Sequence, residues 1–343
     1  MKITMLLLLI FSLLLGSTEN AAAASSPKRV TLLTLFGASD VENSYNYLCT
    51  EGLRHAAERF GKKKLITASV NINDAALAER TLDQAASASD LVIITADAFL
   101  KFLPEAVKKY PDCSFITVGC QESKLPQVKE IAFRDEEGGF LAGALAALIT
   151  EKSSVKNINS EKIIGLITGK ELESVKDFEK GYRAGAWYID PEIKVLKESI
   201  NSFSDASLAG KAAEKLHTLG ADVIFSVAGV SQNGAAEVAR DGGFWIIGAD
   251  TELEEKYPES VLTSAVKRID SLIYWILVQY VKGKIPVTDL SVGIKENCLD
   301  LSLWTRAAKL NIPVDIRQRV EAIADKLADG LIKIKAVESG SLR

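Results

Sequence analysis

The chain has 343 residues, of which 48% are hydrophobic and 25% are charged, and its formal net charge at pH 7 is −4. This composition excludes a disordered or fibrous chain, and the length allows two cores because single cores usually stop growing at about 250 to 300 residues. Both signs of charge are mixed along the chain without a basic stripe, which argues against nucleic acid as a partner.

The first 24 residues have the pattern of a secretory signal peptide. Lys2 precedes an apolar run over 5–15, and small residues follow as far as Ala24. The run is shorter than the roughly 20 residues that a membrane-spanning helix needs. We therefore expect an exported protein of the periplasm or cell envelope. No cysteine follows the run as a lipid-attachment site, so cleavage near Ala24 is expected, with an uncleaved membrane anchor as the alternative.

From residue 29 onward, short β-branched apolar runs alternate with longer amphipathic segments, as in βαβ units. Strands are expected at 30–36, 64–70, 91–96, 114–119 and 131–133, with helices near 43–60, 74–88 and 98–109. After a polar linker at 151–162, further strands are expected at 162–169, 193–199, 221–228, 244–249 and 261–267. A helix at 269–283, the segment 290–302 and a terminal helix from about 313 to 333 follow.

This pattern predicts two doubly wound α/β domains. The first lobe is expected to comprise 29–145 and part of 270–302, and the second 160–268 and the terminal helix to about 335. FRDEEGGFLAGALAAL at 133–148 lies between them. Its acids suit the first turn of a helix, and its glycines and alanines predict close packing, so we interpret it as the seam between the lobes. Arg134 and Asp135 are its candidate ligand contacts.

Constellations for catalysis are scarce. The two histidines, His55 and His217, both fall in predicted helices, which argues against a histidine-based metal site or catalytic triad. Four cysteines occur at 49, 113, 120 and 298. Cys113 and Cys120 bracket one predicted strand, so their Cα atoms should lie about 23 Å apart, too far for a disulfide. We predict free thiols, no metal and no enzymatic activity.

Parallel sheets bind ligands at the carboxyl ends of their strands, which directs attention to the residues there. Asp250 ends a predicted strand, where its carboxylate can accept hydrogen bonds from two vicinal hydroxyls. The alternative is that it caps the next helix. Lys267 ends another predicted strand. Phe36 and Tyr45 flank the loop after the first strand, where aromatic rings can stack on a flat heterocycle.

Six blocks of the sequence, in order, resemble the basic membrane protein family, the substrate-binding lipoproteins of ABC importers that include purine-nucleoside and riboflavin binders. The blocks are ENSYN-x5-EGL (42–53), FRDEEGGFLAG (133–143), FEKGYRAGA (178–186), IFSVAGVSQNG (224–234), IIGAD (246–250) and VLTSAVKRID (261–270). The resemblance implies a type I periplasmic-binding-protein-like fold with a hinge and an interdomain cleft. It also implies a receptor, expected to be a monomer, that delivers a small molecule to a permease and its ATPase.

The resemblance places ligand contacts at Tyr45 and Asn46, at Asp250 on ribose-type hydroxyls with Lys267 beside it, and at the backbone of Gly229. Nucleoside-binding members carry an aspartate where this chain has Phe36, and Tyr45 replaces their usual phenylalanine. These departures predict riboflavin, as transported ligand rather than cofactor. Purine nucleosides are the alternative ligand, and a nucleoside-processing enzyme or a ligand sensor are the alternative classes.

Overall fold

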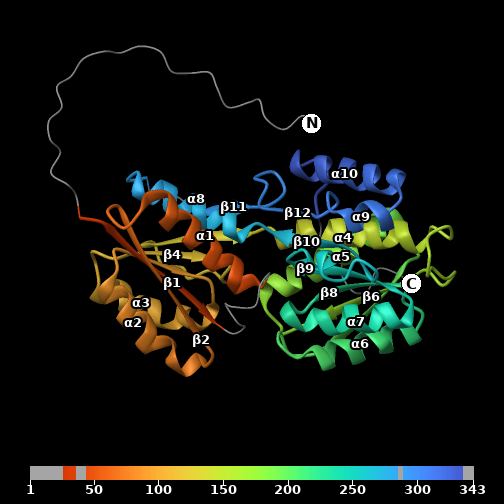
Figure 1. Ribbon diagram of the computed structural model, residues 1–343, viewed down its shortest axis with the longest axis horizontal. Helices are drawn as coiled ribbons and strands as arrows, with labels where there is room; N and C mark the ends of the chain where they lie inside the picture. Colours follow the sequence, from red (N-terminus) through yellow and green to blue (C-terminus); the bar gives the residue numbers. More distant parts are fainter. Residues whose placement is uncertain (1–25, 36–43, 285–288, 335–343) are drawn as a thin grey trace, which may run out of the picture.

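The computed structural model describes residues 26–35, 44–284 and 289–334, so the predicted signal peptide lies outside the described residues. Two lobes lie side by side, each built on a six-stranded sheet (Figure 1). The predicted architecture of two doubly wound α/β domains is confirmed. None of the described helices is long and apolar enough to cross a membrane.

The first sheet is entirely parallel and has helices on both faces. Its strand order is β11-β5-β4-β3-β1-β2. One face packs against α1 (Tyr45–Phe60) and α8 (Ile269–Val281), and the other against α2 (Ala78–Ala88) and α3 (Leu103–Lys109). Coverage on both sides explains why the central strands are almost continuous runs of Leu, Ile and Val. The strands are β1 (Lys28–Leu35), β2 (Leu65–Ile72), β3 (Leu91–Ile94), β4 (Ser114–Val118), β5 (Val128–Phe133) and β11 (Leu290–Val292).

The second sheet repeats this arrangement in the order β12-β10-β9-β8-β6-β7, with only the β10–β12 pair antiparallel. One face packs against α4 (Asp135–Thr150) and α5 (Glu173–Ile189), and the other against α6 (Ala206–Thr218) and α7 (Gln232–Gly242). The strands are β6 (Ile163–Thr168), β7 (Lys194–Ser199), β8 (Val223–Val227), β9 (Trp245–Asp250), β10 (Val261–Lys267) and β12 (Leu299–Leu301).

The C-terminal segment adds two helices to the second lobe, α9 (Arg306–Asn311) and α10 (Val314–Ala328). The terminal helix expected over about 313–333 is shorter in the structure, because α10 ends at Ala328. Gly330 takes a left-handed conformation, with φ of 70°, and its amide donates to the Leu327 carbonyl. A glycine in this conformation is a common helix stop. The four cysteines are free; Cys49 is buried and the other three are partly buried.

The helix α4 corrects the predicted boundary at residue 145, because it packs wholly within the second lobe. Gly139 and Gly143 of α4 meet Gly181 and Gly185 of α5. A Cβ added to Gly143 would lie 1.9 Å from the Tyr182 carbonyl oxygen, and the other three glycines are equally crowded by backbone. The two helices thus touch backbone to backbone. The first lobe's main segment ends at β5, and α4 is core of the second lobe rather than a seam.

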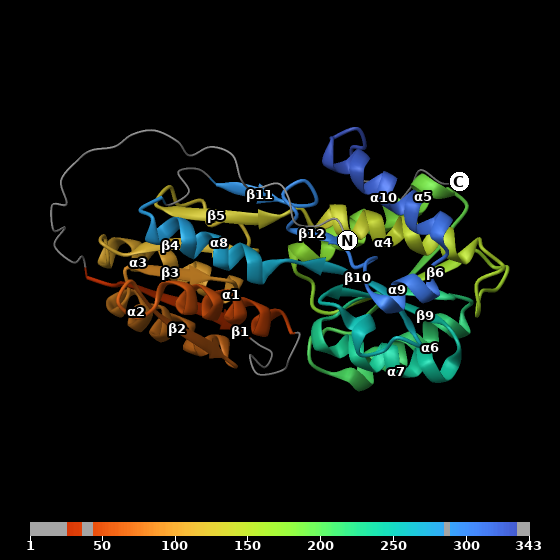
Figure 2. The ribbon, with the colours of Figure 1, turned by 45° about the horizontal axis from the view of Figure 1, so that its top comes forward.

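The chain passes between the lobes three times: from β5 to α4, from β10 to α8, and from β11 to β12 (Figure 2). Arg134 lies at the first crossover and fastens it to the third. Its guanidinium pairs with Glu137 and Glu296, each at 2.5 Å, and donates to the Ser291 carbonyl at 2.6 Å. Arg134 is not among the residues that line the cavity, and its three partners hold it at the crossovers.

Candidate ligand-binding site

A cavity of about 390 Å³ lies between the lobes, where the carboxyl ends of strands from both sheets face each other. In each sheet the strand order reverses direction between β1 and β3, or between β6 and β8. Such a switch point opens a crevice at the strand ends, which is where doubly wound folds bind ligands. Leu35 and Thr95 from the first lobe and Lys170 and Val227 from the second line the cavity at these points.

Six of the predicted contact residues come together here, although they are spread over more than 200 positions of the chain. They are Tyr45, Asn46, Asp135, Gly229, Asp250 and Lys267. The remaining one, Phe36, lies outside the described residues. Because the cavity is defined without a ligand, the role of each residue in binding stays a prediction.

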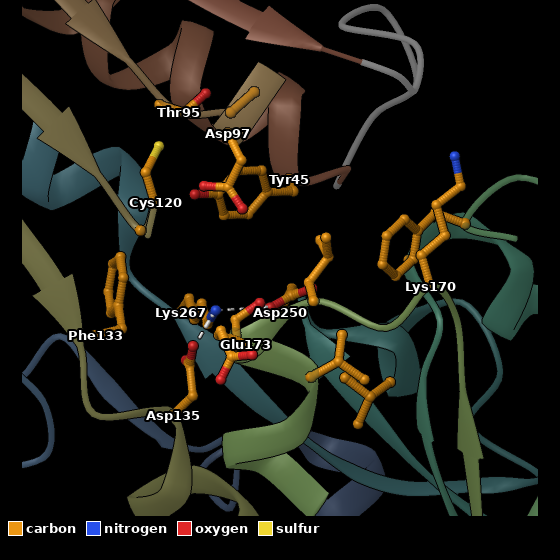
Figure 3. A pocket seen from close by; sticks show the side chains of 18 of the residues that line it. Tyr45, Thr95, Asp97, Cys120, Phe133, Asp135, Lys170, Glu173, Asp250 and Lys267 are labelled. Atoms are coloured by element: carbon orange, nitrogen blue, oxygen red, sulfur yellow. Dashed lines mark ion pairs between the residues drawn. The ribbon is translucent and has the colours of Figure 1, made fainter. Parts of the chain in front are cut away.

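Lys267 forms the centre of a charged floor (Figure 3). Its ammonium lies 2.8 Å from an Asp135 carboxylate oxygen and 3.8 Å from one of Asp250. It also lies over the rings of Phe133 and Phe178, at 5.2 and 5.0 Å from their centroids. Such enclosure removes the lysine from bulk water, so its charge is held by specific partners rather than by solvent.

Burial and attraction act in opposite directions on the two members of this pair. Burial raises the pKa of Asp135 to about 7, although Lys267 pulls it down. For Lys267, burial disfavours the ammonium, but attraction to Asp135 and Asp250 outweighs it and raises the pKa. The lysine is therefore charged at neutral pH, and Asp135 titrates near neutrality.

Asp250 ends β9 in a conformation that few side chains adopt. Its φ is 67°, in the left-handed region, and its carboxylate lines the cavity. The next helical turn begins only at Leu253, after Glu252, so Asp250 is not its cap. Backbone strain of this kind costs about 1–3 kcal/mol and concentrates at functional sites. The geometry thus favours the hydroxyl-binding interpretation of Asp250 over helix capping.

An aromatic ring lines the cavity from each lobe. In the first lobe, Tyr45 opens α1, and a Cβ added to Gly119 would lie 3.2 Å from its hydroxyl. Burial raises the pKa of Tyr45 well above 10, which keeps the phenol neutral. In the second lobe, Phe203 lies against Gly169 and Gly229 at the ends of β6 and β8. An added Cβ would approach its ring to 2.3 Å at Gly169 and its carbonyl oxygen to 3.0 Å at Gly229.

Several lining residues were not among the predicted contacts, notably Asp97, Glu173, Asp177, Phe178 and Phe203. Asp97 was foreseeable, since it follows β3 and the rule of strand ends applies to it. The same rule applied to β7 would have found Phe203. Asp177 and Phe178 lie on α5, one turn from its start, and no strand end marks them. Within the described ranges, no group of three or more His, Cys, Asp or Glu side chains could hold a metal ion.

Two α/β lobes of like topology, joined by three crossovers around a cleft with aromatic walls and a charged floor, define a solute-binding protein of the periplasmic type. The match to known families agrees with this class. Residues 33–334 match the family model described as ABC transporter substrate-binding protein PnrA-like. The chain belongs to this family of basic membrane proteins.

Among curated relatives, basic membrane protein D of Borreliella burgdorferi (strain JD1) is 33% identical over 222 residues, or 62% of this chain and 61% of that protein. Basic membrane protein A of Borreliella burgdorferi (strain B31) is 26% identical over 337 residues, covering 95% and 93%. For the first five relatives, the match spans 43–61% of the relative's own length.

A solved structure, the ABC transporter solute-binding protein from Aeropyrum pernix K1, superposes with a TM-score of 0.77 at 22% identity. The superposition covers 92% of this chain and 95% of that one. At this identity the likeness concerns the fold.

Proposed function

We propose that the chain captures riboflavin in the cleft, closes around it and delivers it to the permease of an ABC importer outside the cytoplasmic membrane. The observation that carries the proposal is that both lobes contribute aromatic rings to the cavity. Tyr45 of the first lobe and Phe203 of the second line the same cavity, so a flat isoalloxazine that contacts both rings would draw the lobes together.

The floor supplies groups for a polyol chain. Asp250 offers carboxylate oxygens that accept hydrogen bonds from vicinal hydroxyls, and Lys267 donates to hydroxyl oxygens. Lys267 is buried and Asp250 is partly buried, and hydrogen bonds to charged groups are worth about 1.5–3 kcal/mol each. The volume of about 390 Å³ falls within the range of about 300–1,000 Å³ typical of pockets that enclose small molecules.

A purine nucleoside is the second candidate, and one observation favours it. Asp97 brings a carboxylate into the first-lobe side of the cavity, although the aspartate expected after β1 in nucleoside binders is replaced by Phe36. A carboxylate at that wall suits the N–H donors of a purine. The ribose hydroxyls would then occupy the same floor as the ribityl chain.

Calorimetric titration of the same preparation with riboflavin, inosine and guanosine separates the two ligands. The proposal expects saturable one-to-one binding of riboflavin and weaker binding of the nucleosides. Tight binding of guanosine or inosine by a colourless protein that ignores riboflavin would overturn the flavin assignment. Chromatography of the nucleoside mixtures after incubation tests the enzyme class, since a nucleoside-processing enzyme would release free base.

A further inference from the structure

The charges that line the cavity are predominantly negative. Among the described residues, five carboxylates border it, against the ammonium groups of Lys170 and Lys267. Three of the five, Asp135, Asp177 and Asp250, all act electrostatically on the single Lys267. Asp177 and Asp250, joined by Asp135 when it is ionised, outnumber the single ammonium and leave the floor acidic.

Among these three aspartates, Asp177 forms no ion pair within the part of the chain that the structure describes. Lys267 lies within 4 Å of Asp135 and Asp250 and forms no such pair with Asp177. Lys180, one turn further along α5, attracts Asp177 but lies beyond ion-pair distance among the described contacts. Asp177 is half buried, so its charge is poorly screened by water.

Three of the helix starts at the cavity carry the protein's own acids, whereas the start of η3 (Gly229–Ser231) has none in its first turn. The helices α4 and α5 and the short 3₁₀ helix η2 (Asp97–Phe102) begin at the cavity, with Asp135, Glu173 and Asp97 in their first turns. The start of α1 is capped by Ser44, whose hydroxyl accepts from the Tyr47 amide. At the starts of α4, α5 and η2, a phosphate entering the cleft would meet carboxylates where a phosphate-binding fold presents bare N–H groups.

We infer that Asp177 is a specificity-determining residue that excludes phosphate monoesters, so that the site takes only ligands whose hydroxyls are free. The inference rests on the proposed function, which places the polyol chain on the floor. The inference also implies that any phosphate ester must be hydrolysed before this protein can capture the ligand. Where the ligand source is a phosphate ester, a phosphomonoesterase must act first outside the membrane: water attacks phosphorus, the P–O ester bond breaks, and the free hydroxyl and orthophosphate leave.

Titration of the full chain with riboflavin and with riboflavin 5′-phosphate tests this inference. We expect the phosphate ester to bind at least about 100-fold more weakly, because a dianion meets uncompensated carboxylates at low effective dielectric. Asp177→Asn keeps the size of the side chain and removes its charge. It should decrease the ratio of the two dissociation constants, phosphate ester over riboflavin, about tenfold. Asp325→Asn, at an exposed position of α10, is the matched control and should leave the ratio unchanged.

Equal affinity for the two flavins would overturn the inference, as would a ratio that Asp177→Asn leaves intact, since the exclusion would then be steric. A Lys170→Gln variant that selectively loses the ester would assign that lysine as a phosphate contact and would also overturn it. If inosine binds and riboflavin does not, the flavin proposal fails alone, and the ratio of inosine to inosine 5′-monophosphate tests the inference. A chain that binds none of these compounds contradicts both.

Discussion

Replacing Asp135 by asparagine should change how the free energy of unfolding depends on pH. Burial raises the pKa of this carboxyl from 3.8 to about 7, even with Lys267 beside it. A carboxyl with a raised pKa in the folded chain stabilises the fold below its unfolded pKa, and this contribution is lost as pH rises through the folded pKa. The pKa of Lys267 is also raised, but this lysine stays protonated in both the folded and the unfolded chain below about pH 10. Its contribution to the free energy of unfolding is therefore constant over the pH range in which Asp135 titrates.

The magnitude follows from the two pKa values of Asp135. A rise from 3.8 to about 7 is about three powers of ten in proton affinity, or about 4 kcal/mol in all. Roughly 3 kcal/mol of this should fall between pH 5 and pH 8. Because asparagine does not titrate, the free energy of unfolding of the wild type minus that of Asp135→Asn should decrease by about that amount over this range.

Urea unfolding followed by circular dichroism at several pH values measures this difference. Asp112→Asn, at an exposed position before β4, supplies the control, and its difference from the wild type should not vary with pH in this way. A difference for Asp135→Asn that stays constant from pH 5 to pH 8, or that increases, would refute the reasoning that the buried carboxyl is held near its point of titration.

Two further changes test the floor and the helix contact. Asp250→Gly removes the carboxylate, and glycine readily adopts the φ of 67°, so the binding free energy measured by calorimetry should weaken by about 1–3 kcal/mol without loss of stability. Glu214→Ala on α6 is the control. Unchanged affinity of Asp250→Gly would show that Asp250 is not a ligand contact. Gly143→Ala should lower the free energy of unfolding by at least about 2 kcal/mol in urea, because its Cβ would meet the Tyr182 carbonyl at 1.9 Å. Gly243→Asn, at a left-handed position (φ 71°, ψ 53°) where an added Cβ would meet nothing closer than 3.6 Å, should be nearly neutral because asparagine tolerates this conformation, and equal effects would argue against the close helix contact.

Much of the fold could be predicted because it depends on local patterns. Central strands of a parallel sheet are apolar on both faces, so runs such as 91–94 and 223–227 can be predicted as strands from their sequence alone. The position of α4 could not be predicted in this way. Its sequence shows a small-residue surface but not which helix will meet it, and the partner glycines, Gly181 and Gly185, lie about 40 residues further along the chain.

The candidate site could likewise be predicted only in part. Asp250 and Lys267 end strands, and the rule of strand ends locates both. The ion pair of Lys267 with Asp135 joins two crossovers 132 positions apart, and only the folded chain shows that the residues meet. Arg134 illustrates the converse. It stands next to Asp135 in sequence, yet it points to Glu137 and Glu296 and serves the crossovers instead of the cavity.

The central claim, a flat ligand held between the aromatic walls of two lobes, is tested most directly by titrating riboflavin with the protein and following flavin fluorescence. Stacking on Tyr45 should quench the emission, so we expect saturable quenching at one ligand per chain. Phe203→Leu, which removes the second-lobe ring, should weaken this binding by about 1 kcal/mol or more. Unquenched emission at micromolar protein, or affinity untouched by Phe203→Leu, would contradict the account.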